Sequence, residues 1–196
     1  MMNPNMAFRI EPKEYDKIQA RFVSEYGYPG PCSMETIREY FDGKPVERGS
    51  RVWNLHNNTF EKFTVNAGIE KHYTDHELEL EEYILYAGMV QSLMLQYSLE
   101  SIRFKTFCGG GLFWMYNDCW GEVGWTIIDY YLRRKISFYG VKRAFEPVKL
   151  ILRQRDGKII VMGCNDTGDD ISIDLRVGWV TFDGTEDDSQ VVPVTL

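Results

Sequence analysis

The stretch that most constrains the fold runs from residue 109 to residue 131 and reads GGGLFWMYNDCWGEVGWTIIDYY. Within it, four successive apolar or aromatic residues extend from Leu112 to Met115. Apolar residues that do not alternate with polar ones are typical of a strand buried on both faces, as in a parallel sheet covered by helices. The stretch therefore predicts a strand of an α/β fold.

Polar groups and large aromatic rings follow this predicted strand directly. Asn117, Asp118 and Trp120 all stand within six positions of Trp114. The carboxyl ends of strands in α/β proteins are where binding clefts form. Aromatic residues alone would suit a core equally well, since tryptophan is usually well buried. A carboxamide and a carboxylate need polar partners, however, and so favour a cleft.

Length and composition narrow the class of protein. The 196 residues give room for one large or two small domains. A net charge of -7 argues against nonspecific binding of nucleic acid, which needs a basic surface. No apolar run approaches the roughly 20 residues of a membrane span, so we expect no membrane partner. The four cysteines are scattered and form no C-x-x-C or Cys/His cluster, so we expect neither a metal nor a cofactor.

A second short strand is predicted near the start of the chain, at residues 21–24. It ends at Glu25, and a loop rich in glycine and proline follows. A carboxylate at the carboxyl end of a short buried strand lies where barrel enzymes keep their chemistry. An exposed glutamate at the end of an ordinary strand is the alternative interpretation from these residues alone.

Helical patterns surround the two strands. Pro12 suits a first helical turn, and Ser33 predicts the N-cap of a short helix that ends near Phe41. Residues 43–73 show little periodicity and predict a long surface loop. Thr74 and Glu77 match a capping box, and from there apolar residues recur at helical spacing to about Phe104. That spacing is carried by Tyr83, Ala87, Val90, Met94 and Tyr97.

The chain changes character near Pro147, after a further predicted helix over residues 133–145. Two strands, 148–153 and 158–162, are predicted to form a hairpin through Asp156-Gly157. Residues 171–177 alternate apolar and polar side chains, and a last strand is predicted over residues 191–194. We therefore expect an α/β domain over residues 1–147, with parallel strands, and an antiparallel β domain over residues 148–196.

Both predicted strands resemble glycoside hydrolase family 2, in its β-mannosidase-like branch. Gly111 to Tyr131 is similar to the last barrel strand and its loop, with the pattern G-x-L-[FY]-W-Q-x-N-D-x-W and then S-W-S-x-x-D-Y-Y. Here Met115 replaces the usual polar residue and Gly121 stands where proline is common. RFVSEYGYPGPCS, residues 21–33, resembles the seventh strand with its S-E-[YF]-G pattern.

The resemblance implies a fold and a reaction. It implies the last two βα units of a (β/α)8 TIM barrel followed by part of an antiparallel immunoglobulin-like β-sandwich. It also implies part of a retaining exo-β-glycosidase that acts on a glycoside or oligosaccharide by double displacement. Glu25 corresponds to the family's nucleophile, and Trp114 to the tryptophan at the floor of the sugar site. The other implied substrate contacts are Asn117, Asp118, Trp120 and the W-x-x-H pair Trp53 and His56.

The second carboxylate of a retaining glycosidase is not apparent in this sequence. The family's acid/base is a glutamate after an asparagine at the end of the fourth strand, and the chain contains no Asn-Glu pair. We therefore expect that strand to lie upstream of Met1, in an N-terminal part of the same enzyme. Asp118 and Glu122 are weaker candidates for this acid.

Other functions remain open from the sequence. Within the family, β-galactosidase, β-glucuronidase and exo-β-glucosaminidase are alternatives to β-mannosidase. From another class of protein, the chain could be a non-catalytic carbohydrate-binding or interaction fragment that keeps the fold without the reaction. An Asn-Glu pair at the end of a fourth strand in upstream sequence would favour the enzyme.

Overall fold

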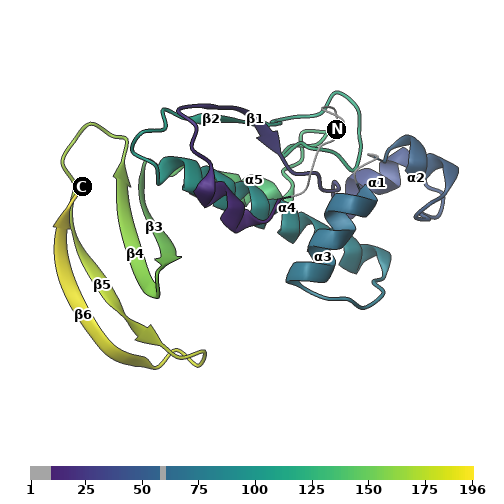
Figure 1. Ribbon diagram of the computed structural model, residues 1–196. Helices are drawn as coiled ribbons and strands as arrows, with labels where there is room; N and C mark the ends of the chain where they lie inside the picture. The colour runs from purple at the N-terminus through teal and green to yellow at the C-terminus, as the bar shows by residue number, and fades with distance from the viewer. Residues whose placement is uncertain (1–9, 58–60) are drawn as a thin grey trace, which may run out of the picture. The chain divides into compact units, whose positions relative to one another are not determined.

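The computed structural model of the chain describes residues 10–57 and 61–196, which divide into two compact units (Figure 1). The first unit ends at Phe145, and the second runs from Glu146 to Leu196. Helices and two short strands make up the described part of the first unit, whereas the second unit consists of strands and turns.

Two short parallel strands form the sheet of the first unit. β1 (Val23–Gly27) and β2 (Gly111–Trp114) are hydrogen-bonded neighbours, and helix α4 (Leu80–Arg103) lies between them in the sequence. Figure 1 shows α4 and α5 (Ile136–Ala144) beneath the two strands. The prediction of two neighbouring parallel strands separated by a helix is confirmed.

Helix α4 supplies the centre of the core. Four of its predicted core residues, Tyr83, Ala87, Val90 and Met94, are almost fully buried. The predicted start of this helix was wrong. The capping box is formed by Glu79 and Glu82, and Leu80 is the first helical residue. The Thr74 hydroxyl instead accepts a hydrogen bond from the backbone N–H of His76 (3.2 Å), which closes a local turn before the helix.

The first helices of the chain are short. η1 (Pro12–Lys17) is a 3-10 helix that starts with proline, and α1 (Met34–Tyr40) follows Ser33. The Ser33 hydroxyl accepts a hydrogen bond from the backbone N–H of Thr36 (3.3 Å), which confirms the predicted N-cap.

Residues 43–73 are not the extended surface loop that their weak periodicity predicted. They contain α2 (Arg51–Leu55), the π-helical turn η2 (Glu61–Asn66) and α3 (Ala67–His72). Trp53, Val65 and Ile69 in this segment are buried in the core, but they stand too far apart to form a periodic pattern.

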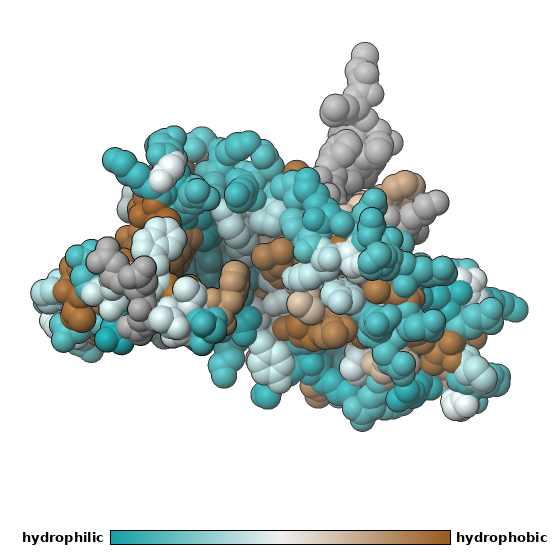
Figure 2. Space-filling view, turned by 90° about the horizontal axis from the view of Figure 1, so that it is seen from below, coloured by the Kyte–Doolittle hydropathy of each residue, from teal (hydrophilic) through white to brown (hydrophobic). Residues whose placement is uncertain are grey.

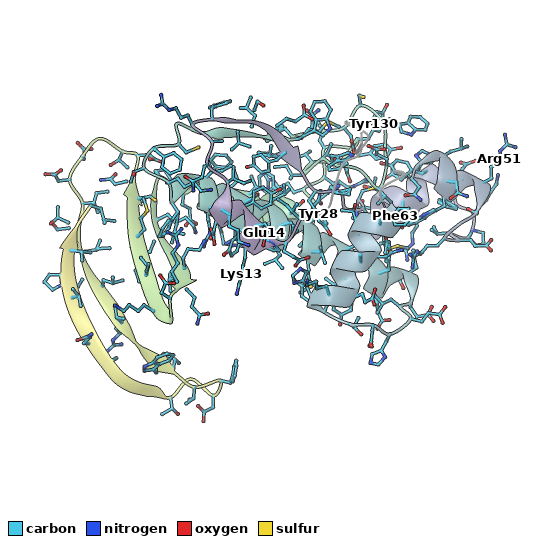
Figure 3. The ribbon with its side chains drawn as sticks, in the orientation of Figure 1. Lys13, Glu14, Tyr28, Arg51, Phe63 and Tyr130 are labelled. Atoms are coloured by element: carbon cyan, nitrogen blue, oxygen red, sulfur yellow. The ribbon has the colours of Figure 1, made fainter. Side chains whose placement is uncertain are left out.

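Tyr28, which follows β1, ties the strand to this helical segment. Its side chain lies between the end of β1 and the helices, and its hydroxyl donates to the backbone oxygen of Thr64 (2.6 Å; Figure 3). Gly68 leaves room for that ring, because a Cβ there would lie 2.3 Å from the Tyr28 hydroxyl. The residues after β1 are thus packed against the segment that the sequence presented as a loop.

Strand β2 is covered on one face only. Phe113 is partly buried against the core, whereas Leu112 is 60% exposed and Trp114 48% exposed. The prediction of a strand buried on both faces is therefore wrong for this chain. Helix α4 covers one face, and the described part of the chain places no second layer over the other. Figure 2 views the molecule from below, the side opposite to β1 and β2 in Figure 1, and shows apolar side chains at that surface as well.

The second unit consists of two hairpins. β3 (Val148–Arg155) and β4 (Lys158–Asn165) pair antiparallel along their whole length, and Asp156 and Gly157 form the turn with positive φ values of 49° and 72°. β5 (Ser172–Val180) and β6 (Glu186–Thr195) pair antiparallel as well. The predicted Asp-Gly hairpin and the antiparallel strands are confirmed.

Candidate active site

Glu25 lies in an irregular part of the β1–β2 pair. Val23 stands opposite Gly111 and Tyr26 opposite Phe113, so three steps along β1 match two steps along β2. This count is that of a β-bulge, which inserts one residue and redirects the side chains beside it. Glu25 belongs to the bulged part, and its side chain is exposed. Nothing in the sequence pattern predicted the bulge.

Gly27 brings the ends of the two strands into contact. It stands opposite Trp114, and a Cβ at position 27 would lie 2.2 Å from the Trp114 backbone oxygen. A side chain at this position would also meet the ring of Trp125 at 3.1 Å. Gly27 is therefore required for close backbone approach, because any other residue would push the strands apart.

The segment after β2 is held by its backbone and presents its side chains outward. The peptide bond between Trp114 and Met115 is cis. The N–H of Met115 donates to Trp125 O (3.1 Å), and Tyr116 O accepts from Ile128 N–H (3.0 Å). The side chains of Trp114, Tyr116 and Asn117 are exposed beside the end of β1. Tyr116 was not among the predicted site residues.

Asp118 faces the interior instead. Its side chain is 8% exposed, and Oδ2 accepts a hydrogen bond from the Thr126 hydroxyl (3.0 Å). Burial raises the pKa of Asp118 to about 6, while the nearby Lys135 ammonium opposes that rise. The carboxylate is thus placed to hold the loop after β2 together, and it does not lie on the surface beside Trp114.

His56 and Trp120 form part of an aromatic stack. The His56 ring lies between Tyr40 and Trp120, with centroid distances of 4.5 Å and 4.7 Å and nearly parallel planes. One imidazole nitrogen, Nδ1, hydrogen-bonds Gly121 O, and the Trp120 indole N–H donates to Leu55 O (3.4 Å). The outer face of the stack is open, because Trp120 is 56% exposed. These two predicted residues are therefore in direct contact.

Trp53 is separated from the exposed aromatic residues. It is 4% exposed, its indole N–H donates to Glu61 Oε2 (3.3 Å), and its ring meets Tyr83 edge-on at 6.3 Å. The Glu61 carboxylate also accepts a hydrogen bond from the Tyr83 hydroxyl. The Trp53 ring therefore belongs to the core beneath α2 and α4 and offers little surface to a ligand.

Two buried charged residues near the site were missed by the sequence analysis. Asp129 is fully buried and accepts from the Thr36 hydroxyl (2.5 Å) and from the backbone N–H groups of Tyr131 (3.0 Å) and Arg133 (2.9 Å). Lys135 is 4% exposed and contacts the loops after both strands. The sequence placed Lys135 inside a helix over residues 133–145, whereas α5 begins at Ile136, and a lysine there gives no sequence signal of burial because lysine is almost always exposed.

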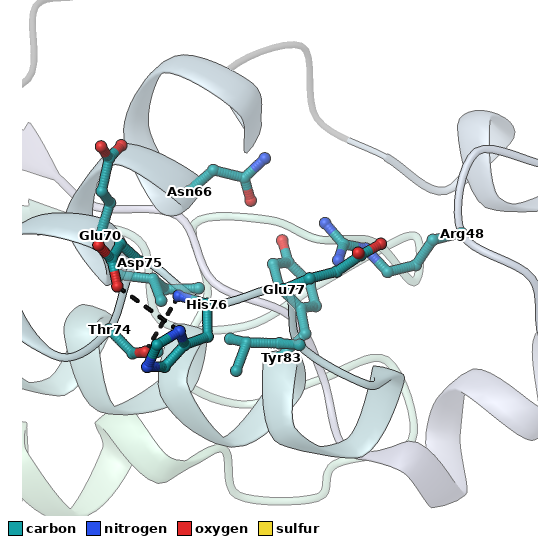
Figure 4. A pocket seen from close by; sticks show the side chains of 10 residues that line it. Arg48, Asn66, Glu70, Thr74, Asp75, His76, Glu77 and Tyr83 are labelled. Atoms are coloured by element: carbon teal, nitrogen blue, oxygen red, sulfur yellow. Dashed lines mark hydrogen bonds and ion pairs between the residues drawn. The ribbon is translucent and has the colours of Figure 1, made fainter.

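A separate pocket of about 240 Å³ lies between α3 and the start of α4 (Figure 4). Arg48, Glu70, Asp75, Glu77 and Tyr83 are among the residues that line it. The Arg48 guanidinium lies over the Tyr83 ring (3.7 Å to the centroid) and 3.8 Å from the Glu61 carboxylate. The pocket contains none of the predicted site residues, so the exposed groups beside β1 and β2 remain the candidate site.

Two further properties concern the described residues alone. Across residues 10–57 and 61–196, no three His, Cys, Asp or Glu side chains gather as ligands for a metal ion. Within the same ranges, every helix is too short or too polar to cross a lipid bilayer.

No family model matches the chain. Known proteins and solved structures that are similar to it are, however, of one kind. β-Mannosidase B of Aspergillus terreus is 33% identical over 148 residues, which cover 71% of this chain and 17% of that protein. β-Mannosidase B of Thermothelomyces thermophilus is 26% identical over 215 residues, which cover 94% of this chain and 25% of that protein. The chain thus spans a quarter or less of these relatives.

Solved structures agree with the sequence comparison. The β-D-mannosidase of Dictyoglomus thermophilum superposes with a TM-score of 0.77 and 32% identity, over 95% of this chain and 24% of that one. The exo-chitosanase CsxA of Amycolatopsis orientalis shares the fold over the same fraction of the chain, with a TM-score of 0.72 and 19% identity. The chain therefore matches, in sequence and in fold, a segment of the β-mannosidases of glycoside hydrolase family 2.

Proposed function

We propose that this chain is part of a retaining exo-β-glycosidase of the β-mannosidase type and that Glu25 is its nucleophile. One observation carries the proposal: Glu25 is an exposed carboxylate in a bulge directly beside the strand that ends at Trp114. The proposal is supported by the likeness of 95% of the chain to a β-D-mannosidase structure.

The proposed architecture follows from the pairing of the strands. β1, α4 and β2 form two successive units of a (β/α)8 TIM barrel, with α5 after the second strand. The parallel pairing and the intervening helix support this assignment. Residues 1–147 then belong to the catalytic domain. Residues 148–196 form part of an immunoglobulin-like β-sandwich, which the two antiparallel hairpins support.

The proposed reaction is a double displacement. The Glu25 carboxylate attacks the anomeric carbon of the sugar, and the bond from that carbon to the leaving oxygen breaks while a second carboxylic acid protonates the oxygen. The resulting glycosyl ester at Glu25 is then hydrolysed by water, which the second carboxylate deprotonates. The configuration at the anomeric carbon is retained because it is inverted twice.

The acid/base is proposed to lie outside this chain. A retaining pair of carboxyl groups stands about 5–5.5 Å apart, both facing the sugar. Asp118 is buried and hydrogen-bonded to Thr126. Glu122 lies against the backbone of its own loop, since a Cβ at Gly124 would meet its Oε1 at 2.4 Å. Both carboxylates are thus engaged within the loop after β2, which supports an acid/base outside this chain.

The remaining predicted residues are assigned to binding. Trp114 would stack against the apolar face of the sugar, since its half-exposed indole offers a rigid surface. Asn117 is exposed beside it and would hydrogen-bond sugar hydroxyls. Trp120, backed by His56, offers a second aromatic face. Asp118 and Trp53 would support these residues from the interior.

The test is the kinetics of Glu25→Gln in the full natural polypeptide that contains these residues. The amide keeps the size of the side chain but removes the nucleophilic charge. Hydrolysis of 4-nitrophenyl β-D-mannoside should fall by a factor of at least about 10³, with the far-UV circular dichroism unchanged, because the lost interaction acts in the transition state. Glu14→Gln, at an exposed glutamate on η1, is the matched control. Near-normal turnover by Glu25→Gln would reject the proposal.

A further inference from the structure

The loops that follow β1 and β2 meet at a backbone bridge between Gly30 and Gly124. The N–H of Gly30 donates to Gly124 O (2.9 Å), and the N–H of Gly124 donates to Gly30 O (3.1 Å). Gly30 stands three residues after the end of β1, and Gly124 belongs to the loop after β2. A Cβ at Gly30 would meet the Gln91 side chain at 2.6 Å, so the bridge is packed directly against α4.

Lys135 binds both carbonyl oxygens of this bridge. Its ammonium donates to Gly30 O (2.6 Å) and to Gly124 O (3.2 Å), although the residue is only 4% exposed. Both glycine oxygens thus accept from the lysine as well as from each other's N–H group. A backbone bridge of two residues is weak by itself, and the buried ammonium adds charge-assisted hydrogen bonds on both sides of it.

Gln91 supports the same junction from α4. Its Nε2 donates to Tyr28 O (2.9 Å) in the first loop and to Thr126 O (3.1 Å) in the second, and its Oε1 accepts from the Ser137 hydroxyl (2.8 Å). Gln91 is fully buried. The loops are therefore joined by one side chain from α4 and by the lysine that precedes α5.

The bridged segment also carries the aromatic stack. The Gly121 oxygen hydrogen-bonds His56 Nδ1, and the N–H of Val123 donates to His56 O (2.9 Å). Residues 121–124 are thus attached to His56 on one side and to Gly30 and Lys135 on the other. Trp120, whose open face is the proposed platform, directly precedes this segment.

Acidic groups surround the ammonium. Asp118 and Glu122 face it from the loop after β2, Asp129 from the segment before α5, and the Cys32 thiol from the loop after β1. Tyr40 of α1 lies behind Cys32, with its hydroxyl 3.8 Å from the sulfur. Burial lowers the pKa of Lys135 to about 8, and the neighbouring anionic groups oppose the loss of its proton.

We infer that Lys135 is a positioning residue: by binding Gly30 and Gly124 together, it fixes the Trp120–His56 stack relative to the strand that carries Glu25. This inference rests on the proposed function for its catalytic meaning, since a fixed distance between stack and carboxylate matters only if a sugar spans the two. The structural part of the inference stands without catalysis and is tested without it.

The first test is nuclear magnetic resonance of this 196-residue chain from pH 6.5 to pH 10.5. The indole N–H signal of Trp120 and the amide signals of Gly30 and Gly124 should share one transition as Lys135 loses its proton. The indole signal of Trp179, on β5 of the second unit, is the internal control and should not follow it. A transition at Gly30 and Gly124 that leaves the Trp120 signal flat would overturn the inference, without any variant having to fold.

The second test compares Lys135→Met with Lys142→Met, which removes the same charge from an exposed position on α5. Lys135→Met should abolish the shared transition and speed amide exchange at Gly30 and Gly124 at least about tenfold. In the full natural polypeptide it should lower kcat for 4-nitrophenyl β-D-mannoside about tenfold, whereas Lys142→Met should match the parent. Unchanged exchange and unchanged kcat in Lys135→Met would overturn the inference. An inactive parent polypeptide would instead reject the proposed function.

Discussion

Gly27 is required because of a contact that its neighbours in the sequence do not reveal. A Cβ at this position would lie 2.2 Å from the Trp114 backbone oxygen, so Gly27→Ala must displace one strand. We expect this substitution to lower the free energy of unfolding by about 1–3 kcal/mol, the usual effect of overpacking. Urea unfolding followed by circular dichroism measures it. Gly109→Ala is the control, because its nearest atom, Arg21 O, is 3.7 Å away. Equal stability of the two variants would contradict the contact.

Asp118 should give the first unit a dependence on pH that an asparagine removes. Burial raises the pKa of Asp118 from 3.8 to about 6. Between these two pH values the carboxyl group is protonated in the folded state and ionised in the unfolded state. The contribution of Asp118 to stability therefore falls as pH rises from about 4 to about 6 and stays lost above that. The two pKa values correspond to at most about 3 kcal/mol.

Urea unfolding of the parent and Asp118→Asn at pH 4.5, 5.5 and 6.5 measures this effect. The substituted carboxamide cannot ionise, so the variant should become more stable relative to the parent as the pH increases. Thr126 keeps an acceptor in the variant, because the amide oxygen can replace Oδ2. A difference in stability that stays constant, or that shrinks with rising pH, would contradict the burial of a charged carboxylate at this position.

Among the elements, α4 was predicted best, because its apolar residues recur at helical spacing along its 24 residues. Its start was missed because two capping patterns, Thr74–Glu77 and Glu79–Glu82, stand five residues apart, and periodicity does not choose between them. The helices of residues 43–73 were missed for a different reason. They are short and are held by distant contacts, such as the hydrogen bond from Tyr28 to Thr64, which a local pattern does not contain.

Helix α4 should be attached to the two loops chiefly through Gln91. Gln91→Met keeps the length of the side chain but leaves Tyr28 O, Thr126 O and the Ser137 hydroxyl without this partner. Loss of a buried hydrogen-bonding partner costs about 1–3 kcal/mol, so we expect a decrease in stability of at least that size. Gln96→Met on the same helix is the control, because Gln96 is only partly buried. Similar urea midpoints for both variants would contradict the role of Gln91.

At the scale of the whole molecule, the order of β1, α4, β2, α5 and the C-terminal strands was predictable, whereas the helices of residues 43–73 and the burial of β2 were not. The sequence identifies β2 by its glycine run, its apolar residues and the polar loop after it. Whether the outer face of β2 is covered depends on elements that are distant in the sequence, so the local pattern does not predict it. Glu25, Trp114 and Asn117 could be proposed because the sequence placed them at or just after the ends of predicted strands, although Glu25 lies inside β1 and the predicted end of that strand at residue 24 was wrong. The bulge at Glu25 and the buried Lys135 depend on strand register and on tertiary packing, and no local pattern encodes them.

The 196-residue chain by itself should hydrolyse 4-nitrophenyl β-D-mannoside at a rate close to that of buffer. A retaining glycosidase needs a second carboxylic acid facing the sugar, and among the described residues Asp118 is buried. The absorbance of released 4-nitrophenolate, with heat-denatured chain as the control, measures the rate. Sustained turnover by the purified chain would contradict this expectation and would make Asp118 or Glu122 the candidate acid.

The measurement that tests the central claim most directly is the site of covalent labelling by a 2-deoxy-2-fluoro-β-D-mannosyl fluoride. The fluoride leaves without the help of an acid, and the 2-fluoro group slows hydrolysis of the glycosyl ester, so the adduct persists on the nucleophile. After labelling of the full natural polypeptide, peptide mapping by mass spectrometry should place the sugar on Glu25, and Glu25→Gln should remain unlabelled. An adduct on any other carboxylate would contradict the account.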